Sequence, residues 1–186
     1  MADIISTKVI TGKVRLSYCR VFEPEIGEDG KAKYSTAIII PKSDTKTLDA
    51  IAKAVEQAKR IGATNKWGGK VPPRLKEPLR DGDEERPDDE AYRNAYFMNC
   101  SCNTKPGIID RNRRPIIDST EIYSGCYAYA SVSFFPFDVS GNRGIACGLN
   151  NLMKVVDGDA LGGRASAEND FAGIGNDEDF EDDLLD

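Results

Sequence analysis

Histidine is absent from the 186-residue chain. It is the side chain most often used as a general base and metal ligand, and it completes Ser-His and Cys-His nucleophile pairs. Its absence argues against an enzyme, although carboxylates, lysines and tyrosines could still do chemistry. We expect no catalytic residue, no metal site and no cofactor.

Long apolar runs are also missing, since none approaches the roughly 20 residues that span a bilayer. The N-terminal sequence MADIISTKVI has an acid at position 3 and no basic stretch before an apolar core, unlike a signal peptide. The five cysteines are odd in number, and Cys100 and Cys102 form a C-x-C pair rather than C-x-x-C. We therefore expect a cytoplasmic protein with structural thiols and no membrane partner.

The acidic residues are unevenly distributed. Nine of the 31 lie from Glu168 onward, where there is no lysine or arginine, so residues 1–167 carry 22 acids and 25 bases. Residues 81–90 hold another seven acids against one arginine, which leaves 15 acids and 24 bases elsewhere in 1–167. This distribution favours a polyanionic partner for the body of the chain.

The periodicity of apolar residues predicts strands and one helix. The helix begins after Ser43 or Asp44 and ends at Gly62, and residues 62–94 read as a long loop. Beyond Asp157 the composition predicts disorder, and we place a domain at 1–163 and a disordered acidic tail at 164–186. The predicted strands lie within 8–22, 33–40, 95–103, 125–137 and 143–156.

Five strands with long excursions predict an all-β fold with one main helix, an OB-fold-like five-stranded barrel. The helix falls between strands two and three, whereas many OB-folds have it between strands three and four. This order indicates either a variant or a strand count that is off by one. A β-sandwich is the alternative fold.

Single-stranded DNA is held by cations that follow the phosphates and by aromatic faces that stack on bases. Trp67, in a polar loop flanked by glycines, is the best stacking candidate, and the turn at 105–114 is a candidate for phosphate contacts. The predicted DNA-binding residues are Arg15, Arg20, Lys33, Tyr34, Lys66, Trp67, Lys70, Arg74, Tyr96, Lys105, Arg111, Arg113, Arg114, Tyr127 and Tyr129.

Several aromatics also fit a packing role. Tyr18 and Phe22 share the predicted strand face of Val14 and Leu16, which favours the core. Phe134 shares a face with alanines and a valine and is expected in the core. Tyr127 and Tyr129 lie on the opposite face, where exposure and packing are equally compatible with the pattern.

Five blocks carry a resemblance to a known family: RLSYCRVFEP, KYSTAIIIPKSD, PLRDGDEERPDDEAYRNAYFMNCSC, EIYSGCYAYASVSFFPF and GIACGLNNLMKVVDGDALGG. In order and spacing the chain resembles bacteriophage single-stranded-DNA-binding proteins, first catalogued as a domain of unknown function and later assigned the OB-fold. The resemblance covers about residues 10–163. It implies non-catalytic coating and protection of single-stranded DNA in phage replication or recombination, within the bacterial host cytoplasm.

The C-terminal sequence DEDFEDDLLD resembles the acidic tails with apolar tips that end many such proteins, although this chain ends on Asp186. The resemblance implies that Phe180, Leu184 and Leu185 recruit replication or recombination proteins, and that the tail competes weakly with DNA. A homo-oligomer is also compatible with the sequence. The rival hypotheses are a Mg²⁺-dependent nuclease using the 81–90 carboxylates and an acidic-tailed protein-interaction module.

Overall fold

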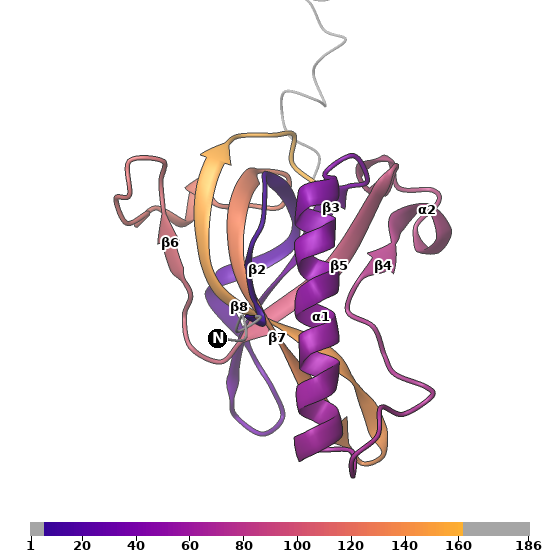
Figure 1. Cartoon of the computed structure of the whole chain (residues 1–186). Helices are drawn as coiled ribbons and strands as arrows, with labels where there is room; N and C mark the ends of the chain where they lie inside the picture. Colours follow the sequence, from indigo (N-terminus) through magenta and orange to yellow (C-terminus); the bar gives the residue numbers. More distant parts are fainter. Residues whose placement is uncertain (1–5, 162–186) are drawn as a thin grey trace, which may run out of the picture.

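The computed structural model describes residues 6–161 of the chain (Figure 1). Strands dominate, and one long helix packs along the side of the sheet. The elements in chain order are β1 (Lys8–Ile10), β2 (Val14–Ile26), β3 (Ala32–Pro41), α1 (Thr45–Asn65), β4 (Arg80–Asp81), α2 (Gly82–Glu85), η1 (Glu90–Tyr92), β5 (Ala95–Cys102), β6 (Gly107–Ile109), η2 (Ser119–Glu121), β7 (Tyr127–Val139) and β8 (Asn142–Val156).

Five strands close into a ring in the order β2, β3, β5, β8, β7 and back to β2. All neighbours are antiparallel except β5 and β8, which pair in parallel at Cys100–Cys147 and Ser101–Gly148. The thiols of Cys100 and Cys147 are buried 3.2 Å apart inside this junction. The predicted five-stranded barrel is confirmed, and the sandwich alternative is wrong because the sheet closes on itself.

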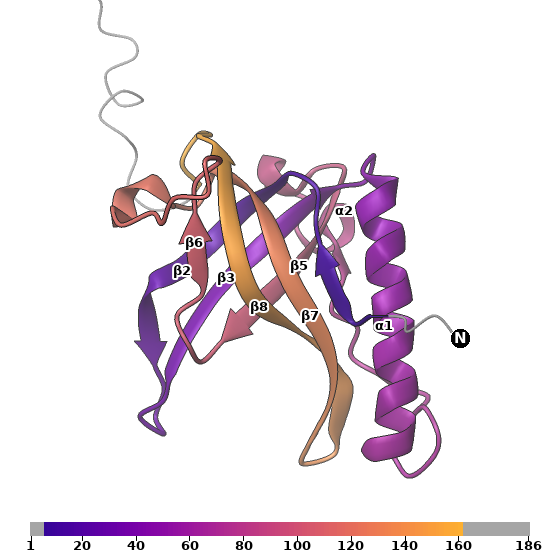
Figure 2. The same ribbon diagram turned by 60° about the vertical axis from the view of Figure 1, so that its left-hand side comes forward.

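Helix α1 covers one side of the barrel and packs mainly against β7 (Figure 2). Asp44, not Ser43, is its N-cap, and the Asp44 carboxylate accepts a hydrogen bond from the Thr47 amide. The prediction that the helix ends at Gly62 is wrong, since α1 continues to Asn65. A Cβ at Gly62 would lie 2.6 Å from the Trp67 ring and 2.7 Å from Pro136, so this glycine permits close packing rather than ending the helix.

A β-bulge in β2 reverses the face on which its later residues lie. Val14 and Leu16 are fully buried, but Tyr18 has a φ of 47° and is 61% exposed. The pairing with β3 shifts between Ser17 and Arg20, so Val21 rather than Tyr18 continues the core. The expectation that Tyr18 packs in the core is therefore wrong, because one bulge changes the parity of a strand. Phe22 is half-buried against the core.

Two segments outside the ring complete the fold. The connection from β5 to β7 carries β6 and η2, and its Ile108, Ile116 and Ile122 are buried in the main core. The segment 157–161 is also held in place, because the Asp159 carbonyl accepts from Arg15 at 2.8 Å and the Leu161 amide donates to the Ser124 carbonyl at 2.8 Å. The predicted disorder immediately beyond Asp157 is wrong for these residues.

Within residues 6–161, none of the helices combines the length and apolarity needed to cross a lipid bilayer. The acidic tail predicted at 164–186, with Phe180, Leu184 and Leu185, lies outside the described residues.

Candidate nucleic-acid interface

The outer face of β3 and β5 is covered along the half of the strands nearest α2. Here Ile39 and Phe97 face outward and are paired across the two strands, yet both are buried. Tyr92 packs edge-on against Phe97, with ring centroids 5.0 Å apart, and its hydroxyl donates to Ser17 at 3.0 Å. The segment 80–94 therefore forms a lid of protein over this part of the sheet.

Arg86 sits among the aromatic rings of this lid. Its guanidinium lies 5.1 Å from the centroid of Tyr92, 5.3 Å from that of Phe97 and 5.5 Å from that of Tyr18. A cation placed over ring faces is attracted by the negative charge of the π-systems. Arg86 thereby connects the covered face to the exposed ring of Tyr18.

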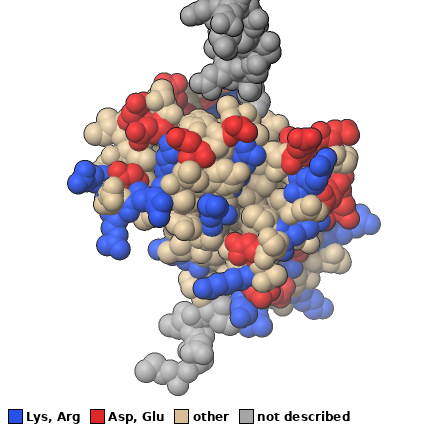
Figure 3. All heavy atoms as spheres, turned by 90° about the horizontal axis from the view of Figure 1, so that it is seen from above, with Lys and Arg blue, Asp and Glu red and all other residues tan. Residues whose placement is uncertain are grey.

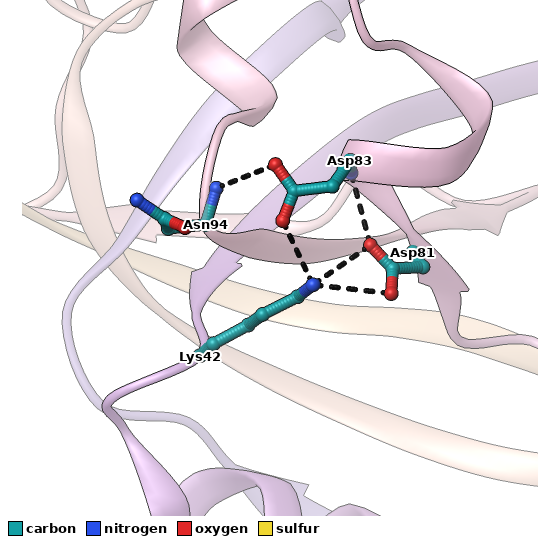
Figure 4. A network of polar contacts seen from close by, with 4 residues as sticks. All are labelled: Lys42, Asp81, Asp83 and Asn94. Atoms are coloured by element: carbon teal, nitrogen blue, oxygen red, sulfur yellow. Dashed lines mark hydrogen bonds and ion pairs between the residues drawn. The ribbon is translucent and has the colours of Figure 1, made fainter.

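Lys42 fastens the acidic side of the same segment (Figure 4). Its ammonium lies 2.9 Å from the Asp81 carboxylate and 2.8 Å from the Asp83 carboxylate. The Asp83 carboxylate also accepts a hydrogen bond from the backbone amide of Asn94 at 3.0 Å. The Lys42 hydrogen bonds hold the pKa of both carboxyls below its ordinary value. These two carboxylates, which the nuclease hypothesis assigned to Mg²⁺, are thus engaged with an ammonium group that anchors the segment to β3.

The remainder of the outer face is open, and small polar side chains form its floor. Cross-strand register places Arg20 opposite Ser35, Ser35 opposite Ser101, and Ser101 opposite Gly148. Gly148 is in turn opposite Ser133 of β7, so one row of residues crosses all five strands of the ring. Directly opposed residues lie on one face of a sheet. After Arg20, the residues of this row carry small side chains or none.

Aromatic and basic side chains border this floor. Phe135 is 48% exposed, and a Cβ on Gly148 would lie 3.4 Å from its ring. Lys33 is exposed next to the β2–β3 turn. The β2–β3 and β7–β8 hairpins extend to the same end of the molecule, with the end of β5 between them (Figure 2). We call this surface the strand face, and define it as Tyr18, Arg20, Lys33, Ser35, Asn99, Ser101, Phe135 and Gly148.

Only two of the residues predicted from the sequence, Arg20 and Lys33, lie on the strand face. Trp67 is 6% exposed and its indole N–H donates to the Phe137 carbonyl at 3.3 Å. The prediction of an exposed stacking face in this loop is wrong, because the glycine-flanked segment folds the ring back onto α1. Tyr34 lies on the side of β3 that faces the inside of the barrel, and it is half-buried.

Other predicted residues are engaged in local contacts. Arg15 donates to the Gly125 and Asp159 carbonyls, and its guanidinium lies 5.5 Å from the half-buried ring of Tyr127. The Lys42 ammonium lies 5.1 Å from the ring centroid of Tyr96. Lys105 lies 4.6 Å from the ring centroid of Phe22. The Arg15 contact with Asp159 fastens the 157–161 segment to the barrel.

The remaining predicted residues are exposed but scattered. Lys66, Lys70 and Arg74 follow α1, while Arg111, Arg113 and Arg114 occupy the turn after β6. Figure 3, viewed from above, shows lysine and arginine side chains on both sides of the molecule, interspersed with acidic side chains. Tyr129 is 40% exposed between β1 and β6, away from the strand face.

Sequence reasoning missed Tyr18 and Phe135 as exposed aromatics. Phe135 has the same strand parity as Tyr127 and Tyr129, so the alternation that placed Phe134 in the core, where it is 2% exposed, also carried the signal for Phe135. For Tyr18 no comparable signal exists, since the bulge depends on the pairing with β3.

Solved structures share this architecture. The single-stranded DNA-binding protein from bacteriophage Enc34 in complex with ssDNA superimposes with a TM-score of 0.74 at 24% identity, over 84% of this chain and 90% of that one. The single-stranded DNA binding protein gp2.5 encoded by bacteriophage T7 gives a TM-score of 0.62 at 17% identity, over 91% and 94% of the two chains. At these identities the likeness establishes the fold.

A closed five-strand ring whose third and fifth strands pair in parallel, with an open face between two hairpins, defines an OB-fold protein. The family model described as "Enterobacter phage Enc34, ssDNA-binding protein" matches residues 7–185. Putative protein p50 of Acyrthosiphon pisum secondary endosymbiont phage 1 is 33% identical over 174 residues, 87% of this chain and 91% of the relative. The chain belongs to the Enc34 family of non-catalytic phage single-stranded-DNA-binding proteins.

Proposed function

We propose that the chain binds single-stranded DNA on the strand face and coats and protects it during phage DNA replication or recombination in the host cytoplasm. The observation that carries the proposal is the row of small polar residues, Ser35, Ser101 and Gly148, bordered by Arg20 at one end and Phe135 at the other. OB-folds bind oligonucleotides on the face of strands two and three, between the loops that follow strands one and four. In this ring those strands are β3 and β5.

The chemistry of the strand face suits DNA without base selection. Stacking on an exposed ring such as Phe135 contributes about 1–3 kcal/mol per base and accepts any base. Arg20 and Lys33 offer cations to the phosphates, although Arg20 also pairs with Glu25 at 3.1 Å. Serine and asparagine side chains supply hydrogen bonds to sugar and phosphate oxygens, which position a strand without reading sequence.

A titration of labelled oligo-dT by fluorescence anisotropy tests the assignment. Phe135→Ala is expected to weaken binding about 5- to 150-fold, the equivalent of one lost stack. The matched control is Val156→Ala, which trims an exposed side chain, 47% accessible, at the far end of β8 and should leave the affinity unchanged. Equal affinities of the two variants for oligo-dT would show that DNA does not bind on the strand face.

A salt series and added Mg²⁺ separate the rival functions. Saturable binding that weakens as salt rises, with the oligonucleotide intact in Mg²⁺, supports coating of DNA. Cleavage that depends on Mg²⁺ would support a nuclease, and absence of binding at low salt would support a protein-interaction module.

The acidic tail completes the proposal. Residues 168–186 carry nine acids and no base, so they can compete with DNA for cations, and Phe180, Leu184 and Leu185 can present an apolar tip to replication or recombination proteins. Deleting 168–186 should therefore tighten oligo-dT binding. Unchanged affinity would contradict self-competition while leaving DNA binding itself intact.

A further inference from the structure

An apolar groove of about 560 Å³ crosses the outside of the barrel away from the strand face. Strands β6, β8, β7 and β1 lie side by side beneath it (Figure 2). Its walls include Ile10, which is 69% exposed, and Tyr129, together with Ile109 and Met153. A cleft of this volume with mostly apolar walls has the size and lining of a site that binds apolar groups.

The lining does not suit nucleic acid. Among its residues there is one aromatic ring, Tyr129, and no lysine or arginine. No residue of the strand face belongs to it. Aliphatic walls of this type accept leucine or phenylalanine side chains from a peptide more readily than a base and its phosphate.

The rim of the groove selects for an acidic peptide. Ile109 at one wall leads directly into the turn that carries Arg111, Arg113 and Arg114, all exposed. Within residues 6–161, no carboxylate forms a salt bridge with any of the three guanidinium groups. The ligand that complements both features has two or three large apolar residues embedded among acids.

The chain itself contains such a sequence beyond the described residues. Asp179–Asp186 reads DFEDDLLD, with Phe180, Leu184 and Leu185 among five acids. The described part ends at Leu161, which is fixed to Ser124, and the following 25 residues reach up to roughly 80 Å when extended. A tethered segment of this length meets the groove at a high effective concentration.

We propose that Phe180, Leu184 and Leu185 of the C-terminal segment dock in the Ile10–Tyr129 groove of their own molecule, with the neighbouring acids facing the Arg111–Arg114 turn. Docking there shelters the apolar tip when no partner protein is present. It also withdraws these arginines from DNA phosphates while leaving the strand face open. The docking does not depend on DNA binding, so its failure would leave the proposed function standing.

Methyl NMR on the full chain tests the proposal, with isoleucine, leucine and methionine methyl groups labelled. The expected result is cross-relaxation between the Leu184 and Leu185 methyls and those of Ile10, Ile109 and Met153, unchanged on dilution. Ile10→Glu, which places an acid in the groove, should abolish these contacts. Ile26→Glu is the matched control, because Ile26 is 62% exposed at the end of β2 and does not line the groove.

Three results would overturn the proposal. No contact between the tail methyls and the groove would exclude this docking site. Absence of groove contacts, together with shifts of the strand-face backbone amides between the full chain and a chain lacking 168–186, would place the tail on the DNA-binding surface. Contacts that weaken on dilution would assign the groove to the tail of a second copy rather than to its own.

Discussion

The two halves of the outer face of β3 and β5 are built from the same strands but carry opposite chemistry. Near α2 the outward residues are Ile39 and Phe97, which the 80–94 segment buries. Toward the hairpins they are Ser35, Asn99 and Ser101, which are exposed or half-exposed. The covered half resembles a small second core, and the open half a binding surface. An outward strand position therefore acquires its role from what lies over it, not from its alternation alone.

The largest expected effect is a loss of folding stability when the packing of the covered half is removed. Phe97→Ala should lower the free energy of unfolding by about 3–5 kcal/mol, because it removes the ring that packs under Tyr92 and leaves a cavity beneath the segment. Urea denaturation followed by Trp67 fluorescence measures it. The control is Phe135→Ala in the open half, which should cost well under that amount. Equal losses would mean that the two halves do not differ in packing.

The second largest expected effect is a loss of DNA affinity when an exposed ring of the open half is removed. Phe135→Ala should reduce the binding free energy for oligo-dT by about 1–3 kcal/mol, whereas folding should change little since the ring is 48% exposed. Anisotropy titration and urea denaturation on the same samples give both numbers. A variant that binds normally but unfolds easily would assign Phe135 to packing.

A smaller effect sharpens the boundary between the halves. Tyr92→Phe removes the hydroxyl that donates to Ser17 and should cost about 0.5–1.5 kcal/mol of stability. DNA binding should not change, because Tyr92 is 1% exposed. Thermal unfolding and anisotropy measure the two quantities. A change in DNA affinity without loss of stability would show that the covering segment takes part in binding.

The smallest effect concerns pH and the anchoring of the 80–94 segment. Lys42 lowers the folded-state pKa of Asp81 and Asp83, so their contribution to stability is complete above the ordinary carboxyl pKa of about 4 and is lost as the pH falls through the lowered folded values. The protection factor of the Asn94 backbone amide, which is the intrinsic exchange rate at each pH divided by the observed rate, should therefore fall in acid, because this amide is bonded to Asp83. Lys42→Met should show a lower protection factor at neutral pH and little further decrease in acid. Identical pH profiles would mean that the ion pair does not hold the segment.

The sequence predicted the five strands of the ring and the main helix because alternation and three- to four-residue spacing are local properties. The Asp44 cap and the buried Phe134 follow from such patterns. The site was harder to predict. Trp67 has the sequence surroundings of an exposed loop, but its burial depends on Gly62, five residues earlier, and on the distant Phe137. Tyr18 is exposed because of a bulge that exists only in register with β3.

By itself, the sequence determined the composition of the molecule: a mildly basic body with an acidic C-terminal segment, five stretches of strand period and one amphipathic helix. Only the tertiary structure decided which outward residues are open. Whether a side chain at an alternating position meets solvent depends on the segment that folds over it, and the Lys42–Asp81 contact that fastens this segment joins residues 39 positions apart. Local periodicity cannot encode such a contact, because it arises only when the ring closes and distant loops fold onto it.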